Sequence, residues 1–287
     1  MTGLSCPACE GALEPRLEPW LARCRSCGLW RSSLGSGRLD ESEVLDEERR
    51  RKGLAAVRAA NIRLTLDLLA RGRPLRGLRL LDVGCAYGWF LLEARSRGIQ
   101  GLGIEPDPAI AEAARREGLD VRTGYFPESV APSETFDVIA FNDVLEHLAD
   151  LDGTLEACRR ILAPGGLLVV SAPSSEGALY RVAVALRRLG VRSPLSRLWQ
   201  EGFPSPHLSY FSRRSLDRLM AKHGLVLRGR RRLRTVSCRG LKDRVGFDTR
   251  SRSWITVPLI AAASPVINFV LPPDQLLSVY RGAWSAS

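Results

Sequence analysis

Short apolar segments alternate with amphipathic ones between residues 78 and 173, and this order limits the possible folds more than any other feature. The apolar segments predict strands at 78–83, 100–105, 120–124, 136–141 and 167–173. Segments with helical spacing predict helices at 88–98, 108–118 and 150–162. Strands that alternate with helices form a parallel sheet covered on both faces. With two last strands from 224–233 and 275–282, the predicted class is α/β, a doubly wound, mostly parallel seven-stranded sheet.

A cysteine pattern precedes this region. Cys6 and Cys9 form one C-x-x-C pair, Cys24 and Cys27 form another, and 14 residues lie between the two pairs. Each pair can supply two thiolates from one tight turn, and two such turns close a tetrahedron around Zn²⁺. Gly28 can adopt the positive φ that such a turn often needs. The spacing predicts a small N-terminal zinc ribbon, and four protein ligands make the zinc structural rather than catalytic.

The stretch LLDVGCAYGWF (80–90) lies at the carboxyl end of the first predicted strand. A Rossmann-like sheet binds its ligands outside the carboxyl ends of the strands. Gly84 and Gly88 surround a turn that enters a helix, whose N-terminus can accept an anion. Ala86 occupies the middle glycine position of the dinucleotide motif G-x-G-x-x-G. The turn alone therefore indicates a nucleotide-like ligand only weakly.

Glu105 narrows the choice of ligand. It ends the second predicted strand about twenty residues after the turn, where a carboxylate can accept hydrogen bonds from both ribose hydroxyls. That placement suits NAD and S-adenosylmethionine equally. The following stretches, FDVIAFNDVLEHL and RRILAPGGLLVVSAPS, do not fit the dehydrogenase pattern.

Together these stretches resemble the class I S-adenosylmethionine-dependent methyltransferases, in the broad group that includes the ubiquinone-pathway O-methyltransferases. The resemblance rests on LLDVGCAYGWFL, GLGIEPDP, FDVIAFNDVLEHLADLDGTLEACRRILAPGGLLVVSAPS and PHLSYFSRRSLDRLMAKHGL, which span about residues 78–225. Members with a four-cysteine ribbon in front are also known. The resemblance implies S-adenosylmethionine as the cofactor, beside the structural zinc of the ribbon.

The resemblance also implies roles for the turn. Backbone from Gly84 to Gly88 would approach the methionine end of the cofactor, with Ala86 in place of the usual middle glycine. Asp82 would face the ammonium group, directly or through water.

Further along, Glu105 would hold the ribose and Asn142 would line the cleft. Tyr125 and Phe126 are placed loosely near the adenine.

Histidines are the candidates for proton transfer. The resemblance places His207 on the substrate side of the cleft, as general base or as a packing histidine. Asp143, Glu146 and His147 would share one face of a helical turn. Related enzymes hold a divalent metal with such a cluster, and a hydrogen-bonded structural turn is the alternative. His223, in the last turn of a helix before a glycine, is expected to be structural.

The predicted organisation has three parts. Residues 1–37 form the zinc ribbon, 38–74 a helical linker, and 75–287 the methyltransferase domain. Within this domain, 175–215 is expected to form a substrate lid and 237–274 an apolar insert.

Residues 253–273 of the insert carry no charge and are long enough to span a membrane. Pro258 and Pro265 interrupt them, and a span would pull the last two strands apart. We expect an apolar helical excursion. Its packing on the domain, a homodimer contact and peripheral contact with an anionic membrane stay open.

Composition adds further expectations. Forty-two Lys and Arg residues less three lysines leave 39 arginines, and the net charge is +11. A solvated arginine-rich surface explains this charge without nucleic acid. The odd number of cysteines and the lack of a secretion signal predict a reducing, cytoplasmic location. Peripheral contact with a membrane surface is compatible with this location.

The sequence therefore predicts a methyltransferase acting on a small molecule or a lipid-linked sugar acceptor, at oxygen in preference to nitrogen or carbon. An RNA methyltransferase that uses the ribbon to contact RNA is an alternative, disfavoured because its usual motifs are absent. A non-catalytic cofactor-binding module is another, disfavoured by the intact Asp82, Gly84 and Glu105.

Overall fold

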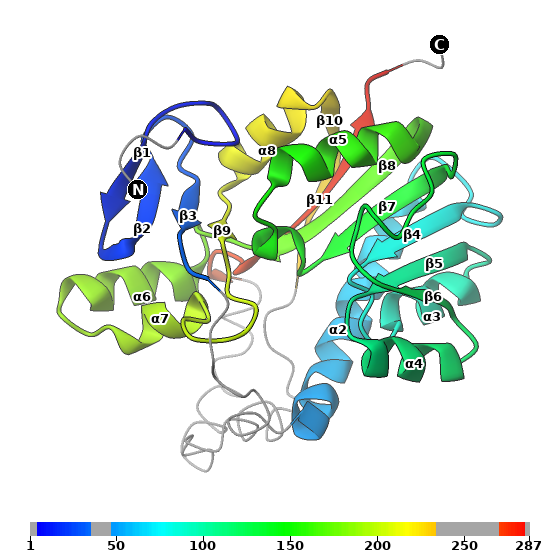
Figure 1. Cartoon of the computed structure of the whole chain (residues 1–287), viewed down its shortest axis with the longest axis horizontal. Coiled ribbons are helices and arrows are strands. Elements are labelled where there is room, and N and C mark those ends of the chain that lie inside the picture. The colour runs from blue at the N-terminus through cyan, green and yellow to red at the C-terminus, as the bar shows by residue number, and fades with distance from the viewer. Residues whose placement is uncertain (1–4, 36–46, 234–269, 285–287) are drawn as a thin grey trace.

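The computed structural model describes residues 5–35, 47–233 and 270–284 of the chain. Its centre is a sheet with strand order β10-β11-β8-β7-β4-β5-β6 (Figure 1). These strands are β4 (Arg79–Val83), β5 (Gln100–Glu105), β6 (Asp120–Thr123), β7 (Phe136–Asn142), β8 (Leu162–Pro173), β10 (Leu225–Arg232) and β11 (Gln275–Gly282). Strands β4 to β8 run parallel, and β11 runs antiparallel to both neighbours. The predicted doubly wound, mostly parallel seven-stranded sheet is confirmed.

Helices cover both faces of the sheet. The helices that do so are α2 (Glu47–Leu69), α3 (Trp89–Ser96), α4 (Pro108–Arg116), α5 (Leu151–Ile161) and α8 (Arg213–Lys222). Helices α2, α3 and α4 share one hydrophobic core with the sheet, and α5 and α8 share the other. Adjacent residues of β4 divide between these cores, Leu80 in the first and Leu81 in the second. The division follows from the alternation of side chains along a strand.

Polar side chains fix where the helices around the site begin. Asp107 caps α4 by accepting a hydrogen bond from the N–H of Ala109 at 2.8 Å, and Pro108 takes a first-turn position. Ser212 and Ser215 form a capping box at the start of α8. Both patterns satisfy backbone donors that a helix N-terminus leaves free. They therefore fix the chain directly after β5 and directly after the loop that carries His207.

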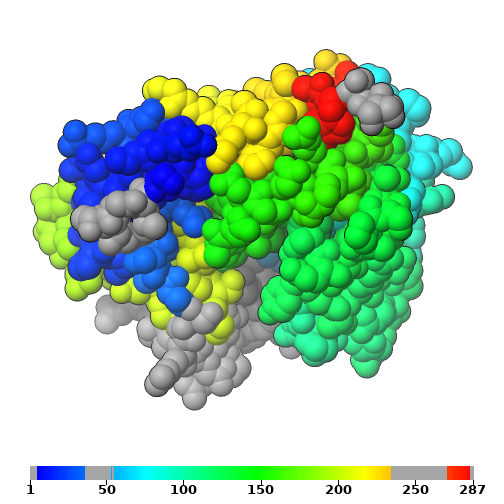
Figure 2. All heavy atoms as spheres, turned by 45° about the horizontal axis from the view of Figure 1, so that its top comes forward, coloured from blue at the N-terminus to red at the C-terminus, as the bar shows by residue number. Residues whose placement is uncertain are grey.

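The N-terminal cysteine region forms three short strands, β1 (Leu13–Arg16), β2 (Glu18–Cys24) and β3 (Trp30–Ser32). Its sheet has the order β1-β2-β3-β9, and β9 (Ser209–Tyr210) comes from the far end of the chain. Figure 2 shows this ribbon, in blue, lying directly against the yellow segment that includes α8. The ribbon is therefore built into the rest of the molecule by a shared sheet.

The predicted lid, 175–215, contains two further helices, α6 (Ala178–Arg188) and α7 (Ser193–Leu198). Both lie beside the ribbon strands in Figure 1. Trp199, directly after α7, is fully buried in a cluster that includes Leu21 and Trp30 of the ribbon. The lid region is thus packed against the ribbon.

Parts of the remaining predictions fall outside the described residues, namely 38–46 of the linker and 237–269 of the apolar insert. On either side of the insert, β10 and β11 pair antiparallel, as expected for the last two strands. Within the described part of the chain, no helix has the length and apolar character needed to cross a membrane.

The arginines of β10 lie on both sides of the sheet. Arg230 forms an ion pair with Asp217 of α8 at 2.5 Å. Arg228 and Arg231 line a cavity next to the end of α2 instead. The arginines of β10 are therefore divided between two environments and do not form one continuous basic surface.

Candidate functional site

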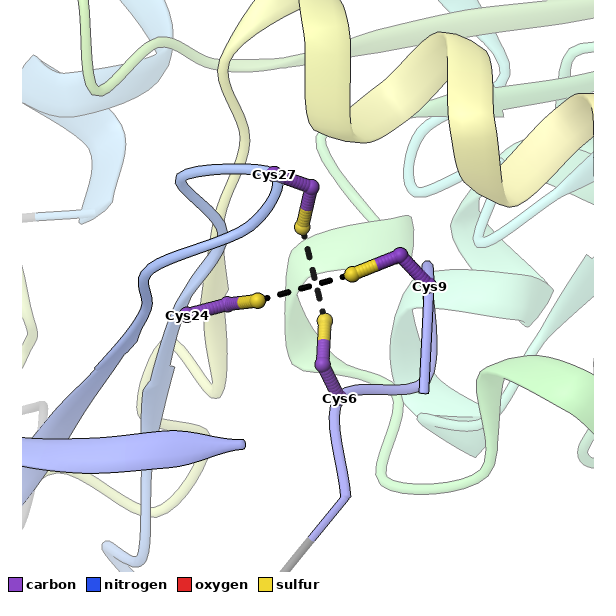
Figure 3. A group of neighbouring side chains, drawn as sticks. All are labelled: Cys6, Cys9, Cys24 and Cys27. Carbon is purple, nitrogen blue, oxygen red and sulfur yellow. Dashed lines mark hydrogen bonds between the residues drawn. The ribbon is translucent and has the colours of Figure 1, made fainter. Parts of the chain in front are cut away.

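The four cysteines of the ribbon form one compact group. The sulfur atoms of Cys6 and Cys27 are 3.5 Å apart, as are those of Cys9 and Cys24. All four lie within 4.8 Å of one another and point toward a common centre (Figure 3). A tetrahedral zinc site with Zn–S bonds of about 2.3 Å places its sulfurs about 3.8 Å apart, whereas a disulfide needs about 2.05 Å. The thiols therefore fit structural Zn²⁺, as the spacing predicted.

Two similar tight turns present these thiols. In the first, the N–H of Glu10 donates to the carbonyl of Cys6 at 2.7 Å, and in the second the N–H of Gly28 donates to Cys24 at 3.0 Å. Both residues have positive φ, 61° for Glu10 and 81° for Gly28. The prediction for Gly28 is confirmed. The first turn places a non-glycine residue in the same conformation.

The turn after β4 has the backbone shape that the glycine pattern indicates. Gly84, Ala86 and Gly88 have φ values of 69°, 48° and 74°. A Cβ at Gly84 would lie 2.5 Å from a methyl group of Val144, and one at Gly88 would lie 2.1 Å from Leu119. Both glycines are therefore required by close packing as well as by φ. Ala86 adopts the left-handed region despite its methyl group.

Two buried acids lie beside this turn. Asp82 is 2% exposed and accepts a hydrogen bond from Nδ2 of Asn142 at 3.1 Å. Burial, with the charge of Glu105 adding to it, raises the pKa of Asp82 to about 7. Glu105 accepts hydrogen bonds from the N–H of Ala86 at 2.9 Å and of Asp107 at 3.0 Å. Burial raises the pKa of Glu105 as well.

A cavity of about 380 Å³ joins the turn to the histidines. Asp82, Gly84, Ala86 and Asn142 line one part of it. His147 and His207 line another part. The structure thus brings the predicted cofactor turn and the predicted proton acceptors together at the carboxyl ends of β4 and β7.

Other predicted positions lie outside this cavity lining. Glu105 contacts the turn through the N–H of Ala86 without lining the cavity. Tyr125 is 71% exposed, and Phe126 packs edge-on against Phe141 with ring centres 5.9 Å apart.

The histidine on the substrate side is held in one tautomer by its hydrogen bonds. Nδ1 of His207 lies 2.7 Å from the carbonyl oxygen of Leu198, so Nδ1 carries the proton. Nε2 then accepts from the side-chain amide of Gln200 at 3.2 Å. Burial, with a contribution from His147, lowers the pKa of His207 to about 3. The ring is therefore neutral near pH 7, and its Nε2 lone pair faces the amide of Gln200, a residue that also lines the cavity.

A second group of ligand-type atoms surrounds His207. Glu146, His147 and His207 each offer one such atom within 4.8 Å of the others. The turn that carries the first two is a 3₁₀ helix, Leu145–His147, and Asp143 is not part of this cluster. The sequence had grouped Asp143 with Glu146 and His147. His207, distant in sequence, takes that place because its loop returns over the turn.

Glu146 itself is 1% exposed, and its Oε2 atom has no hydrogen-bond partner within the described residues. Burial and the charge of Asp143 raise the pKa of Glu146. His223 lies away from this group and contacts Asp152 at 2.8 Å through Nε2, which agrees with its predicted structural role. Gln200 is a site residue that sequence reasoning did not single out, because its position depends on the folded loop.

Comparison with known proteins identifies the family of this chain. Residues 48–228 match the family described as "Methyltransferase domain". The chain belongs to this methyltransferase family. It is 36% identical over 127 residues to the ubiquinone biosynthesis O-methyltransferase of Xanthomonas oryzae pv. oryzae (strain PXO99A), which covers 42% of this chain and 53% of that protein. It is 37% identical over 118 residues to the Cereibacter sphaeroides (strain ATCC 17025 / ATH 2.4.3) protein of the same name, covering 39% and 47%.

The methyltransferase thus spans about half the length of the curated relatives it matches. Among solved structures, it is similar to a geranyl diphosphate C-methyltransferase from Streptomyces coelicolor A3(2), with a TM-score of 0.53 and 16% identity. That match covers 87% of this chain and 90% of the other. At this identity the similarity concerns the fold alone.

Proposed function

We propose that this chain is an S-adenosylmethionine-dependent methyltransferase that acts on a hydroxyl group of a small molecule. The observation that carries the proposal is the single cavity that joins the cofactor turn at Asp82 and Gly84 to Nε2 of His207. A binding module without chemistry would need only the first half. The relatives named as O-methyltransferases support oxygen as the acceptor atom.

In the cofactor half, the backbone from Gly84 to Gly88 would receive the methionine part of S-adenosylmethionine. Asp82 would balance the ammonium charge, and Glu105 would accept hydrogen bonds from the ribose while its two backbone donors hold it in place. When bound, the cofactor supplies an electrophilic methyl group on a sulfonium. The chain's part is to position it, which can contribute about 7–11 kcal/mol.

In the acceptor half, a second cavity of about 340 Å³ shares Arg58, Asp143 and His207 with the first. Its apolar lining comes from α2, α6, the end of α7 and β9, and includes Val57, Leu179, Tyr180, Leu198 and Tyr210. This chamber suits a compact, largely apolar or aromatic acceptor that carries a hydroxyl. We assign the acceptor to it.

His207 would then take the proton. Nε2 of His207 would exchange its hydrogen bond from Gln200 for the hydroxyl proton of the acceptor, while the acceptor oxygen would gain the methyl group and the carbon–sulfur bond would break. The products are a methyl ether and S-adenosylhomocysteine. The hydrogen bond from Nδ1 to the carbonyl of Leu198 keeps the ring in the orientation that this transfer needs. General base catalysis of this kind contributes about 10²–10⁴-fold.

The cluster of Glu146, His147 and His207 supports a second mechanism at the same site. The partnerless Oε2 of Glu146 and two neutral imidazoles are ligands that a divalent cation accepts. A cation held there would polarise the acceptor hydroxyl directly. The low pKa of His207 favours this use of its lone pair, because a ring with a pKa of about 3 is a weak base.

Calorimetric titration with S-adenosylmethionine, S-adenosylhomocysteine and NAD tests the cofactor first. We expect micromolar binding of both sulfur compounds and none of NAD. Failure of both sulfur compounds to bind would refute the proposal.

Methyl transfer to a panel of hydroxylated aromatic compounds then tests the histidine. We expect His207→Ala to bind S-adenosylhomocysteine normally and to lose about 10²–10⁴-fold in rate. His223→Ala is the matched control and is expected to retain activity. Loss of the wild-type rate on chelation of divalent ions, restored by Mg²⁺, would favour the metal mechanism over His207 as base. Equal rates for His207→Ala and wild type would exclude both roles.

A further inference from the structure

We propose that the cysteine ribbon is a working part of the active site: a metal-locked clamp that positions His207, the turn of His147 and the wall of the acceptor chamber. Arg31 and Ser32 are its positioning residues. The inference rests on the proposed function where it calls the second cavity the acceptor chamber. The contacts between the ribbon and His207 do not depend on that assignment.

The clamp begins with the pairing of β3 and β9. Trp30 pairs with Tyr210, and Arg31 pairs with Ser209. The N–H of Ser32 donates to the carbonyl of Leu208 at 3.0 Å. These bonds attach the ribbon to the residues that immediately follow His207.

Ser32 also reaches His207 itself. Its hydroxyl donates to the carbonyl oxygen of His207 at 2.9 Å, and Ser32 is 6% exposed. The backbone of His207 is thus held from the ribbon side, while its ring is held by Leu198 on the other side. A buried hydrogen bond of this kind fixes the backbone from which the imidazole projects.

Arg31 spans from the ribbon to the second histidine. Its Nη1 donates to Oγ of Ser209 at 2.7 Å, and its Nη2 donates to the carbonyl of Ala149 at 3.1 Å. Ala149 lies two residues after His147, the last residue of the 3₁₀ turn that presents Glu146 and His147. One guanidinium therefore ties together the two segments that carry the histidines.

The chamber wall is backed by the ribbon as well. Tyr180 and Tyr210, which line the acceptor chamber, have ring centres 4.6 Å apart. Trp30 of the ribbon packs against Tyr180 with ring centres 6.0 Å apart. All three belong to one hydrophobic cluster with Leu21 of the ribbon.

An ion-pair group holds the lid helices to the same ribbon. The carboxylate of Glu18, whose side chain is 2% exposed, pairs with Arg187 and with Arg192 at 3.0 Å. Burial by itself would raise the pKa of Glu18, but pairing with Arg187 and Arg192 outweighs burial and lowers this pKa. Arg187 belongs to α6, which also supplies Tyr180. A buried acid with two arginine partners is costly to leave unpaired, so it favours one lid position.

Metal binding would control these contacts because the cysteine turns hold the ribbon in shape. The ribbon's strands are short, and its turns pack into the core that includes Phe211 and α8. The hydroxyl of Ser212 donates to the carbonyl of Cys27, one of the four cysteines of the proposed metal site, at 3.2 Å. Structural zinc typically supplies the folding free energy of such small modules. Loss of the metal is therefore expected to release His207 and the lid together.

The cofactor half lies outside the clamp. Between the described ribbon, residues 5–35, and Asp82, Glu105 or Asn142, the described contacts include no hydrogen bond or ion pair. The clamp therefore predicts a separation of effects. Perturbing it should loosen the acceptor half while S-adenosylhomocysteine still binds.

Hydrogen–deuterium exchange of the full chain tests this separation. We compare wild type, Arg31→Ala and Ser32→Ala, with Arg25→Ala as the matched control. Arg25 is an exposed ribbon arginine that pairs with Glu14. We expect amides of residues 145–149 and 198–212 to exchange about tenfold faster in Arg31→Ala, and those of the control to be unchanged. Zinc content and S-adenosylhomocysteine affinity should stay at wild-type levels in every variant.

Nitrogen NMR of ¹⁵N-histidine-labelled protein reports the tautomer of His207. A purely structural role of Ser32 would leave this tautomer unchanged. Wild-type His207 is expected to show a fixed Nδ1–H tautomer, and Ser32→Ala an averaged signal. Stripping the metal with a chelator should produce both changes in the wild-type chain.

Unchanged exchange and unchanged histidine signals in Arg31→Ala and Ser32→Ala would overturn the clamp. The same holds if metal removal leaves residues 198–212 protected. If the metal-free chain unfolds entirely, the exchange and NMR results for zinc-loaded Arg31→Ala and Ser32→Ala decide whether the clamp proposal holds. Failure of the wild-type chain to bind S-adenosylhomocysteine would refute the proposed function instead, and the exchange data would still judge the clamp.

Discussion

Replacing Asp82 by Asn is expected to make the ligand-free protein more stable while it removes cofactor binding. The side chain is buried beside the turn, and its carboxylate faces no cationic partner within the described residues. Above about pH 7 the folded protein therefore holds a charge that no cationic side chain of the described residues neutralises. Asn has nearly the same shape and can still accept the hydrogen bond from Asn142.

The size of the effect follows from the pKa. Burial and the charge of Glu105 raise the pKa of Asp82 from 3.8 to about 7. At about 1.4 kcal/mol per pH unit, this corresponds to at most about 4 kcal/mol. Because the folded state binds the proton more tightly than the unfolded chain, Asp82 lowers stability progressively between the two pKa values and fully above about pH 7. We expect Asp82→Asn to gain about 2–4 kcal/mol at pH 8, and less than half of that gain at pH 5.

Urea unfolding of both proteins at pH 8 and pH 5 measures this difference. Asp67→Asn is the matched control, since that side chain is 60% exposed and pairs with Arg97 at the surface. Its effect should stay within about 0.5 kcal/mol. Calorimetry should show at least a tenfold loss of S-adenosylhomocysteine affinity for Asp82→Asn alone. A destabilised Asp82→Asn at pH 8, or a gain that does not shrink at pH 5, would show that desolvation does not govern this carboxyl.

Three further predictions concern the turn, the ribose acid and the ribbon. Ala86→Gly relieves a left-handed φ of 48° and should raise the free energy of unfolding by up to about 1 kcal/mol at unchanged S-adenosylhomocysteine affinity; weaker binding in calorimetry would contradict this. Glu105→Gln should weaken S-adenosylhomocysteine binding about tenfold, and equal affinity would remove Glu105 from the site. Cys27→Ser should lower bound zinc well below one ion per chain in metal analysis, whereas Cys158→Ser, a buried cysteine of α5, should leave it unchanged.

The sheet could be predicted because its signals are local and its topology rules are general. The predicted strands 100–105 and 275–282 match β5 and β11 at both ends. Strand β8 begins at Leu162 rather than at residue 167, because residues before the turn already pair with Phe136 of β7. That pairing depends on a neighbour distant in sequence, which an apolar run does not reveal.

The same distinction separates the two halves of the site. Asp82, Gly84 and Gly88 lie within one strand and one turn, so the local sequence predicts that they lie together, and the family resemblance implies their roles. The acceptor half is assembled from the turn at Glu146, the loop at His207 and the ribbon at Arg31. No short segment contains that arrangement, and the sequence accordingly grouped Glu146 with Asp143 instead of with His207.

The ribbon shows why a motif can be identified without its role. Cysteine spacing identifies a metal module because four thiolates suffice to define the site. Its role depends on β3 and β9, which are three and two residues long and carry no strand signal of their own. Strand β3 lies between β2 and β9, and β9 comes from a distant part of the chain, so this pairing is a property of the folded chain. The proposed link between the cysteine group and His207 therefore runs through backbone pairing that no sequence pattern marks.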